Sequence, residues 1–77
     1  MIMESGRVYK HIRARDIVFY CVATHSDNTA TGYYMNCHYF ENGSRPDLFL
    51  CTDDLFTVPN NSHEWKEYTE YEGTINL

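Results

Sequence analysis

Three residue types used in nucleophilic catalysis lie side by side at His25, Ser26 and Asp27. A Ser-His-Asp relay works when its members converge in space. Direct neighbours in a strand or turn do not converge in this way, and no nucleophile-elbow or oxyanion-hole signature lies beside them in the sequence. We therefore expect His25 to end a strand and Ser26 and Asp27 to shape a turn, and we predict a protein that is not an enzyme.

The cysteines and histidines offer enough ligands for zinc, but their spacing does not favour a zinc site. The sequence contains no Cys-x-x-Cys pair and no His-x-x-x-His pair, and Cys37 and His38 point to opposite faces of one expected strand. A nucleophilic cysteine needs an electropositive setting, which the acidic composition disfavours. We predict buried free thiols at Cys21 and Cys37, with no metal and no cofactor.

The acidic C-terminal region is the leading candidate for a binding surface. Residues 47–77 have seven carboxylates against one lysine, a net charge of −6. Aromatic side chains lie between these carboxylates and would anchor the region on a basic protein surface. The alternative is an ordinary solvated edge strand whose charges discourage aggregation. The predicted partner-binding residues are Asp53, Asp54, Glu64, Trp65, Glu67, Tyr68 and Tyr71.

The N-terminal region has the opposite charge and gives an alternative function. Residues 1–15 have four arginine or lysine residues against Glu4, a net charge of +3. Cations beside an aromatic ring bind nucleotides or single strands through phosphate contact and stacking. The net charge of −5 for the whole chain argues against general nucleic-acid affinity. The residues predicted for nucleotide or nucleic-acid binding are Tyr9, Lys10, Arg13 and Arg15.

A β-hairpin over residues 16–40 is expected to position these groups. Residues 17–24 are apolar on both parities, which indicates a strand covered on both faces or curled into a barrel. The side chains of residues 33–40 alternate between a more apolar and a more polar set. This alternation indicates one buried and one solvent-exposed face. Two registers suit this pattern, one with Tyr20 opposite Met35 and one with Cys21 opposite Met35. We favour the second, because the small Cys21 and Ala23 leave room for large rings.

Shorter elements flank the hairpin. Residues 7–12 and 47–51 are expected to be strands, and residues 53–56 a single helical turn capped by Thr52. Residues 63–68 are interpreted as a last strand in preference to a helix with aromatic residues spaced three apart. Residues 74–77 are expected to fray. The prediction is an all-β domain over residues 1–77, a strongly bent antiparallel sheet or SH3-like barrel of four to five strands with one helical turn.

Several motifs together resemble a family of small bacterial and phage proteins of unknown function. They are a Gly-x-x-Tyr-x-His opening at residues 6–11, a strand ending Val-Ala-x-His-Ser at residues 22–26, and a Tyr-rich return strand at residues 33–40. A short turn ending in Phe follows at residues 53–56. The sequence departs from the pattern at Cys21, where the family usually has Gly, and at residues 44–47. The resemblance implies an SH3-like bent sheet and suggests a phage-encoded protein, and it implies no activity because the family has none assigned.

The sequence also favours a particular compartment and set of partners. Three cysteines cannot form a complete disulfide framework, and the N-terminus lacks the apolar run of a signal peptide. No segment approaches the length of a transmembrane helix. We therefore expect a cytoplasmic protein without membrane association. The predicted partner is an unidentified protein, and a homodimer formed through Tyr-rich edge strands stays open.

Overall fold

The chain is an all-β protein. A computed structural model describes residues 3–13, 16–38, 46–60 and 63–77, and these residues form strands and no helix. The strands are β1 (Val8–His11), β2 (Ile17–Thr24), β3 (Thr29–His38), β4 (Asp47–Leu50), β5 (Phe56–Pro59), β6 (Trp65–Glu67) and β7 (Ile75–Asn76). The predicted all-β class is therefore confirmed, with more strands than the four to five expected.

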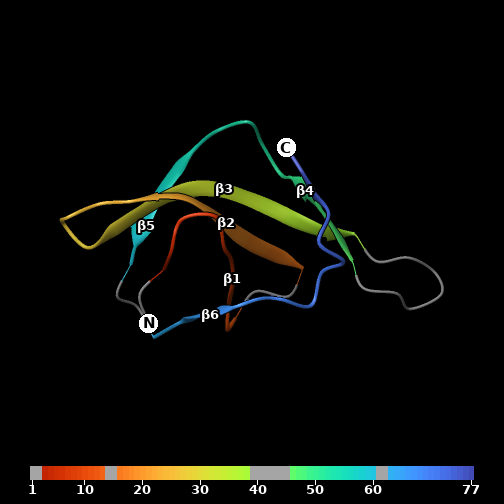
Figure 1. Cartoon of the computed structure of the whole chain (residues 1–77), viewed down its shortest axis with the longest axis horizontal. Coiled ribbons are helices and arrows are strands. Elements are labelled where there is room, and N and C mark those ends of the chain that lie inside the picture. Colours follow the sequence, from red (N-terminus) through yellow and green to blue (C-terminus); the bar gives the residue numbers. More distant parts are fainter. Residues whose placement is uncertain (1–2, 14–15, 39–45, 61–62) are drawn as a thin grey trace.

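All seven strands belong to one bent sheet (Figure 1). Its order is β6-β1-β2-β3-β4-β7, and β5 pairs with the first half of β3 while β4 pairs with the second half. The outermost strands β6 and β7 do not pair with each other, so the described sheet is open and not a closed barrel. The pair β4–β7 is parallel, which corrects the purely antiparallel prediction.

The β2–β3 hairpin has neither of the two predicted registers. Val18 pairs with Met35 and Tyr20 with Tyr33, and a β-bulge lies between Cys21 and Ala23. The favoured register, with Cys21 opposite Met35, is wrong because β3 begins at Thr29, four residues before the alternation becomes visible. The side chains face the same way as in the alternative with Tyr20 opposite Met35. Up to the bulge, however, each residue of β2 pairs two residues earlier in β3 than that alternative has it.

The turn between β2 and β3 explains this early start. The amide of His25 donates to the carbonyl of Thr29 at 2.9 Å, which closes a three-residue loop. Asn28 has a φ of 64°, the left-handed conformation that asparagine tolerates in such loops. The Thr29 hydroxyl donates to Asp27 at 2.5 Å. Asp27 therefore shapes the turn, as expected.

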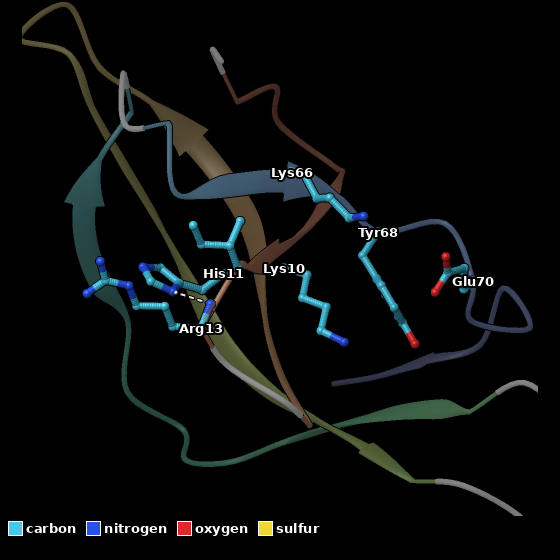
Figure 2. A pocket seen from close by; sticks show the side chains of 7 residues that line it. Lys10, His11, Arg13, Lys66, Tyr68 and Glu70 are labelled. Carbon is cyan, nitrogen blue, oxygen red and sulfur yellow. Dashed lines mark hydrogen bonds between the residues drawn. The ribbon is translucent and has the colours of Figure 1, made fainter.

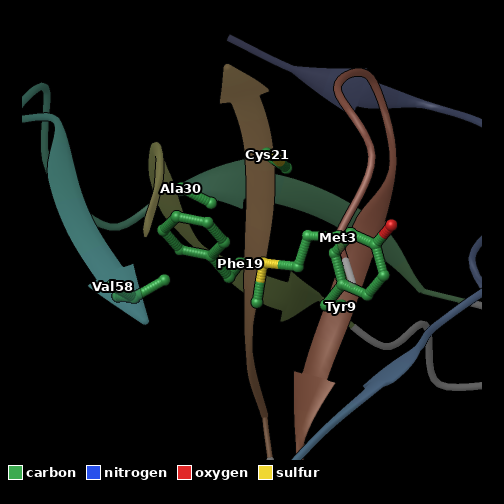
Figure 3. Packing of buried hydrophobic residues seen from close by; sticks show 6 residues of the cluster. All are labelled: Met3, Tyr9, Phe19, Cys21, Ala30 and Val58. Atoms are coloured by element: carbon green, nitrogen blue, oxygen red, sulfur yellow. The ribbon is translucent and has the colours of Figure 1, made fainter. Parts of the chain in front are cut away.

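Each face of the sheet has its own hydrophobic core. The first core consists of Met3, Tyr9, Phe19, Cys21, Ala30 and Val58 (Figure 3). The second core consists of Val8, Val18, Met35, Cys37, Leu48 and Tyr68. Because alternate residues of β2 enter different cores, this strand is covered on both faces, as its apolar sequence predicts.

Two of the predicted local structures are wrong. Thr52 accepts a hydrogen bond from the amide of Asp54 at 3.2 Å, but no helical turn follows, because Phe56 begins β5 and pairs with Gly32. Residues 75–76 do not fray but form β7 beside β4. The Asn76 side chain donates to the carbonyl of Leu48 at 2.9 Å, and Ile75 packs on the second core. Polar and apolar contacts thus fix the C-terminal strand.

Candidate functional site

The pairing of β1 with β6 brings the two predicted binding regions together. Lys10 pairs with Lys66, His11 with Trp65, and Tyr9 with Glu67. The ladder continues at both ends, where Ile12 donates to the carbonyl of Glu64 and Tyr68 donates to that of Val8. The basic and acidic regions, more than fifty residues apart in the sequence, are therefore two sides of one edge of the sheet.

Side chains of this edge alternate between the two faces of the sheet. Lys10 pairs with Val18 of the second core, so Lys10 and its partner Lys66 lie on the face of that core. His11 and Trp65 lie on the opposite face, where their rings are 5.1 Å apart and the Trp65 ring lies 5.7 Å from Phe19. The two lysines therefore share one face and are separated from the Trp65 ring.

A pocket of about 490 Å³ opens at this edge (Figure 2). Its volume is within the range of small-ligand sites. Figure 2 shows the Lys10 and Tyr68 side chains extending in the same direction, with Arg13 on one side of them and Glu70 on the other. The residues that line it are Lys10, His11, Ile12, Arg13, Lys66, Tyr68 and Glu70.

The pocket contains both lysines of the sequence. The Lys10 ammonium group lies 5.5 Å from the centre of the Tyr68 ring, a cation–π contact. Within residues 3–13, 16–38, 46–60 and 63–77, neither lysine forms an ion pair. Like charges directly opposite each other in neighbouring strands destabilise a sheet. The pair Lys10–Lys66 thus places two positive charges side by side at the pocket.

Two carboxylates beside this edge contact other side chains, and Glu70 lines the pocket itself. Glu64 contacts His11 at 2.9 Å and Arg13 at 3.9 Å. Glu67 pairs with Arg7 at 2.7 Å, and this hydrogen bond is the main reason that the pKa of Arg7 is raised above its usual value. Arg7 also pairs with Glu4. These contacts hold β6 against β1. They also reduce the unpaired negative charge that the predicted partner-binding residues present to solvent.

The aromatic residues of the predicted protein-binding region are mainly structural. Tyr68 is 4% exposed in the second core, and Tyr71 packs against that core with its ring stacked 6.3 Å from the Tyr68 ring. Trp65 is half-buried against the first core. Asp53 and Asp54 are exposed between β4 and β5, and β1, β2 and β3 separate them from β6. The seven predicted residues therefore do not form one surface.

The residues predicted to bind a nucleotide differ in burial and in their place in the structure. Lys10 and Arg13 line the pocket, whereas Arg15 lies outside the described residues. Tyr9 is 2% exposed in the first core, its hydroxyl accepts from the Glu4 amide at 2.7 Å, and burial raises its pKa. Its ring is therefore unavailable for stacking. Sequence reasoning missed Lys66, which only the pairing of β1 with β6 places beside Lys10.

The residues first considered for catalysis and metal binding do not assemble a site. The His25 ring contacts the Thr31 hydroxyl at 2.7 Å. Cys21 and Cys37 are buried, as predicted, and burial raises the pKa of Cys21 and of Cys51. Among the residues with described positions, no group of three or more His, Cys, Asp or Glu side chains is arranged to hold a metal ion.

Comparison with protein families, with curated proteins and with solved structures found no match. The part of the chain that the structure describes contains no helix long and apolar enough to cross a membrane.

Proposed function

We propose that the pocket between β1 and β6 binds a phosphate-bearing ligand of nucleotide size. The main support is the opposed pair of Lys10 and Lys66, neither of which forms an ion pair within the described part of the chain. A phosphate between the two ammonium groups would remove their repulsion and accept charge-assisted hydrogen bonds, worth about 1.5–3 kcal/mol each. Relative to the nucleotide site predicted from the sequence, Lys66 is added and Tyr9 is removed.

A small ligand fits the surroundings of the pocket better than a long nucleic-acid strand. The chain has a net charge of −5, and Glu64 and Glu70 lie beside the lysines, so an extended polyanion would meet repulsion outside the pocket. Ile12 is 62% exposed at the pocket and offers an apolar surface to the uncharged part of a ligand. The proposed role is non-enzymatic binding, with no chemical step.

Isothermal titration calorimetry with ADP at low ionic strength tests this function. Lys66→Gln removes one cation of the pocket, whereas Arg7→Gln makes the same charge change on the opposite face. We expect the Kd for ADP to rise about tenfold or more in Lys66→Gln, because one charged hydrogen bond is lost, and about twofold or less in Arg7→Gln. Added salt should weaken binding by the wild type.

Two further titrations distinguish the source of the phosphate. Inorganic phosphate that binds as tightly as ADP would show that only the anion is recognised. A ten-residue oligothymidylate that binds more tightly than ADP, with the same dependence on Lys66, would assign the pocket to the end of a nucleic-acid strand. Absence of binding by all three compounds at low salt would contradict the proposal, as would equal affinities of the wild type and Lys66→Gln.

The other function predicted from the sequence, docking of a protein on the acidic C-terminal region, has less support at β6. Its rings at Tyr68 and Tyr71 pack on the second core, and its carboxylates at Glu64 and Glu67 pair with His11 and Arg7. Asp53 and Asp54 remain exposed, away from β6.

A further inference from the structure

The face of the sheet that bears the first core also has large apolar side chains in contact with solvent. Ile17 is 44% exposed, Phe49 is 41% exposed and Phe56 is 40% exposed. Ile17 and Phe49 both pair with Asn36 from opposite sides, so they lie in one row across β2, β3 and β4. Phe56 pairs with Gly32 on the same face.

Ring contacts at β3 connect Phe56 to Tyr34 and to the first core. The Tyr34 ring lies 5.1 Å from the Phe56 ring and 5.5 Å from the Phe19 ring of the first core. Along β3, Tyr34 and Asn36 are successive residues of the same face, and Asn36 pairs with Phe49. We call Ile17, Tyr34, Phe49 and Phe56 the aromatic strip. Exposed apolar surface of this kind marks interaction sites more often than isolated apolar residues do.

In the described parts of the chain that contain the aromatic strip, the charged side chains are aspartates. Residues 16–38 and 46–60, which contain β2 to β5, include five aspartates and no lysine or arginine. Asp47 precedes Phe49 by two residues on β4, and Asp53 and Asp54 directly precede Leu55 and Phe56. Apolar anchors bordered by carboxylates are complementary to a surface that has both apolar side chains and cations.

We infer that the aromatic strip is a docking surface for a basic segment of a partner protein. Apolar side chains of the segment would cover Phe49, Tyr34 and Phe56, and its arginine or lysine residues would contact Asp47, Asp53 and Asp54. This surface lies on the face opposite to Lys10 and Lys66, so it is distinct from the proposed nucleotide pocket. The inference therefore stands or fails independently of the proposed function.

Fluorescence anisotropy with a labelled ten-residue peptide of alternating arginine and leucine tests the docking surface. Phe49→Ser removes an anchor of the strip, and Leu77→Ser is its matched control, because Leu77 is 68% exposed and lies outside the strip. Asp53→Asn removes a border charge, with Glu72→Gln as its control. We expect the Kd to rise about tenfold in Phe49→Ser and at least threefold in Asp53→Asn, with both controls within twofold of the wild type.

Further measurements exclude other occupants and effects of misfolding. Phe56→Ser provides a second anchor variant, and thermal unfolding of each variant checks that it is folded. Equal weakening of peptide binding by Phe49→Ser and Leu77→Ser would overturn the inference. So would a peptide affinity that changes with the salt concentration but not with the substitutions in the strip. A wild-type dimer in sedimentation that Phe49→Ser dissociates would assign the strip to a second copy of the chain. Binding of an oligothymidylate that is lost in Phe49→Ser would assign it to nucleic acid, and either result contradicts the inference.

Discussion

Gly32 shows how closely the backbone of β3 approaches β2 beside the bulge. A Cβ atom at this position would fall on the carbonyl oxygen of Tyr20 and within 2.9 Å of the Phe19 ring. Since Tyr20 is itself held in the ladder between β1 and β3, the contact can be relieved only by moving backbone. The absence of a side chain at Gly32 is therefore a requirement of the fold.

Gly32→Ala is expected to destabilise the protein by about 3 kcal/mol or more, since overpacking here displaces backbone as well as side chains. For a domain of this size that corresponds to a fall in Tm of more than about 10 °C, measured by circular dichroism. Thr31→Ala, one residue away on the half-exposed side of β3, is the control and should lower Tm much less. Similar values of Tm for wild type and Gly32→Ala would show that the two strands are not packed as described.

Asp27 gives a prediction about pH. The hydrogen bond from the Thr29 hydroxyl is the main cause that lowers the pKa of Asp27 in the folded protein below the value of about 3.9 in unfolded chains. An acid whose folded pKa is lowered stabilises the protein above the unfolded pKa, and this contribution disappears as the pH falls through the folded pKa. The affected range therefore begins near pH 4 and extends downward.

Thermal unfolding of the wild type and Asp27→Asn between pH 7 and pH 2 measures this effect. We expect the wild type to have the higher Tm at pH 6, and the difference between the two proteins to shrink steadily below pH 4. A difference in Tm that is the same at pH 6 and pH 2.5 would contradict the assigned role of the Asp27 carboxylate.

At the scale of elements, β7 couples the C-terminal region to the second core. Ile75 packs on that core beside Tyr68 and Tyr71, and it pairs in parallel with Leu48. Short edge strands of this kind depend on side-chain burial more than on their few backbone hydrogen bonds. The half-buried Ile75 is therefore the main apolar contact of β7, beside the hydrogen bond from the Asn76 side chain to Leu48.

Ile75→Ala should reduce the free energy of unfolding by about 1–2 kcal/mol, less than the 2–5 kcal/mol of a fully buried isoleucine because Ile75 is half-buried. Urea unfolding followed by circular dichroism measures this loss. Leu77→Ala removes a side chain that is 68% exposed and should leave the urea midpoint almost unchanged. If both substitutions had the same small effect, residues 75–76 would not contribute a strand to the sheet.

The elements that could be predicted from the sequence are those whose pattern is local. The apolar run of β2 predicts a strand covered on both faces, and Asp27 and Asn28 predict the turn that follows. The early start of β3 was missed, because Thr29, Ala30, Thr31 and Gly32 lack the strong alternation of the residues after them. Their strand conformation results from pairing with β5, a contact between distant parts of the chain.

The same limit applies to the candidate site. Lys10 was recognised within a cluster of basic residues, but Lys66 stands alone among carboxylates in the sequence. Only the long-range register of β1 with β6 places the two ammonium groups on one face. Tyr9 and Tyr68 look like exposed aromatic anchors beside charges, yet strand alternation directs one into each core. A tyrosine ring suits either position, so its sequence context does not decide between them.

For the molecule as a whole, the two proposed binding sites lie on opposite faces of a thin sheet. The positive pocket lies on the face of the second core at one edge, and the aspartate-rich stretch of β2 to β5 borders the aromatic strip on the other face. A single domain of this size thus offers two surfaces of opposite charge preference. We expect an anionic ligand and a basic segment to bind without competing with each other.

Carbon-13 NMR of the protein after reductive methylation of its amines is the most direct test of the central proposal, the phosphate-binding pocket. Lys10 and Lys66 are the only lysines, so this labelling gives two side-chain signals besides that of the N-terminal amine. Methylation preserves the positive charge. On titration with ADP, we predict that both lysine signals shift together with one common Kd. Lysine signals that stay fixed up to millimolar ADP at low salt would contradict the proposed pocket.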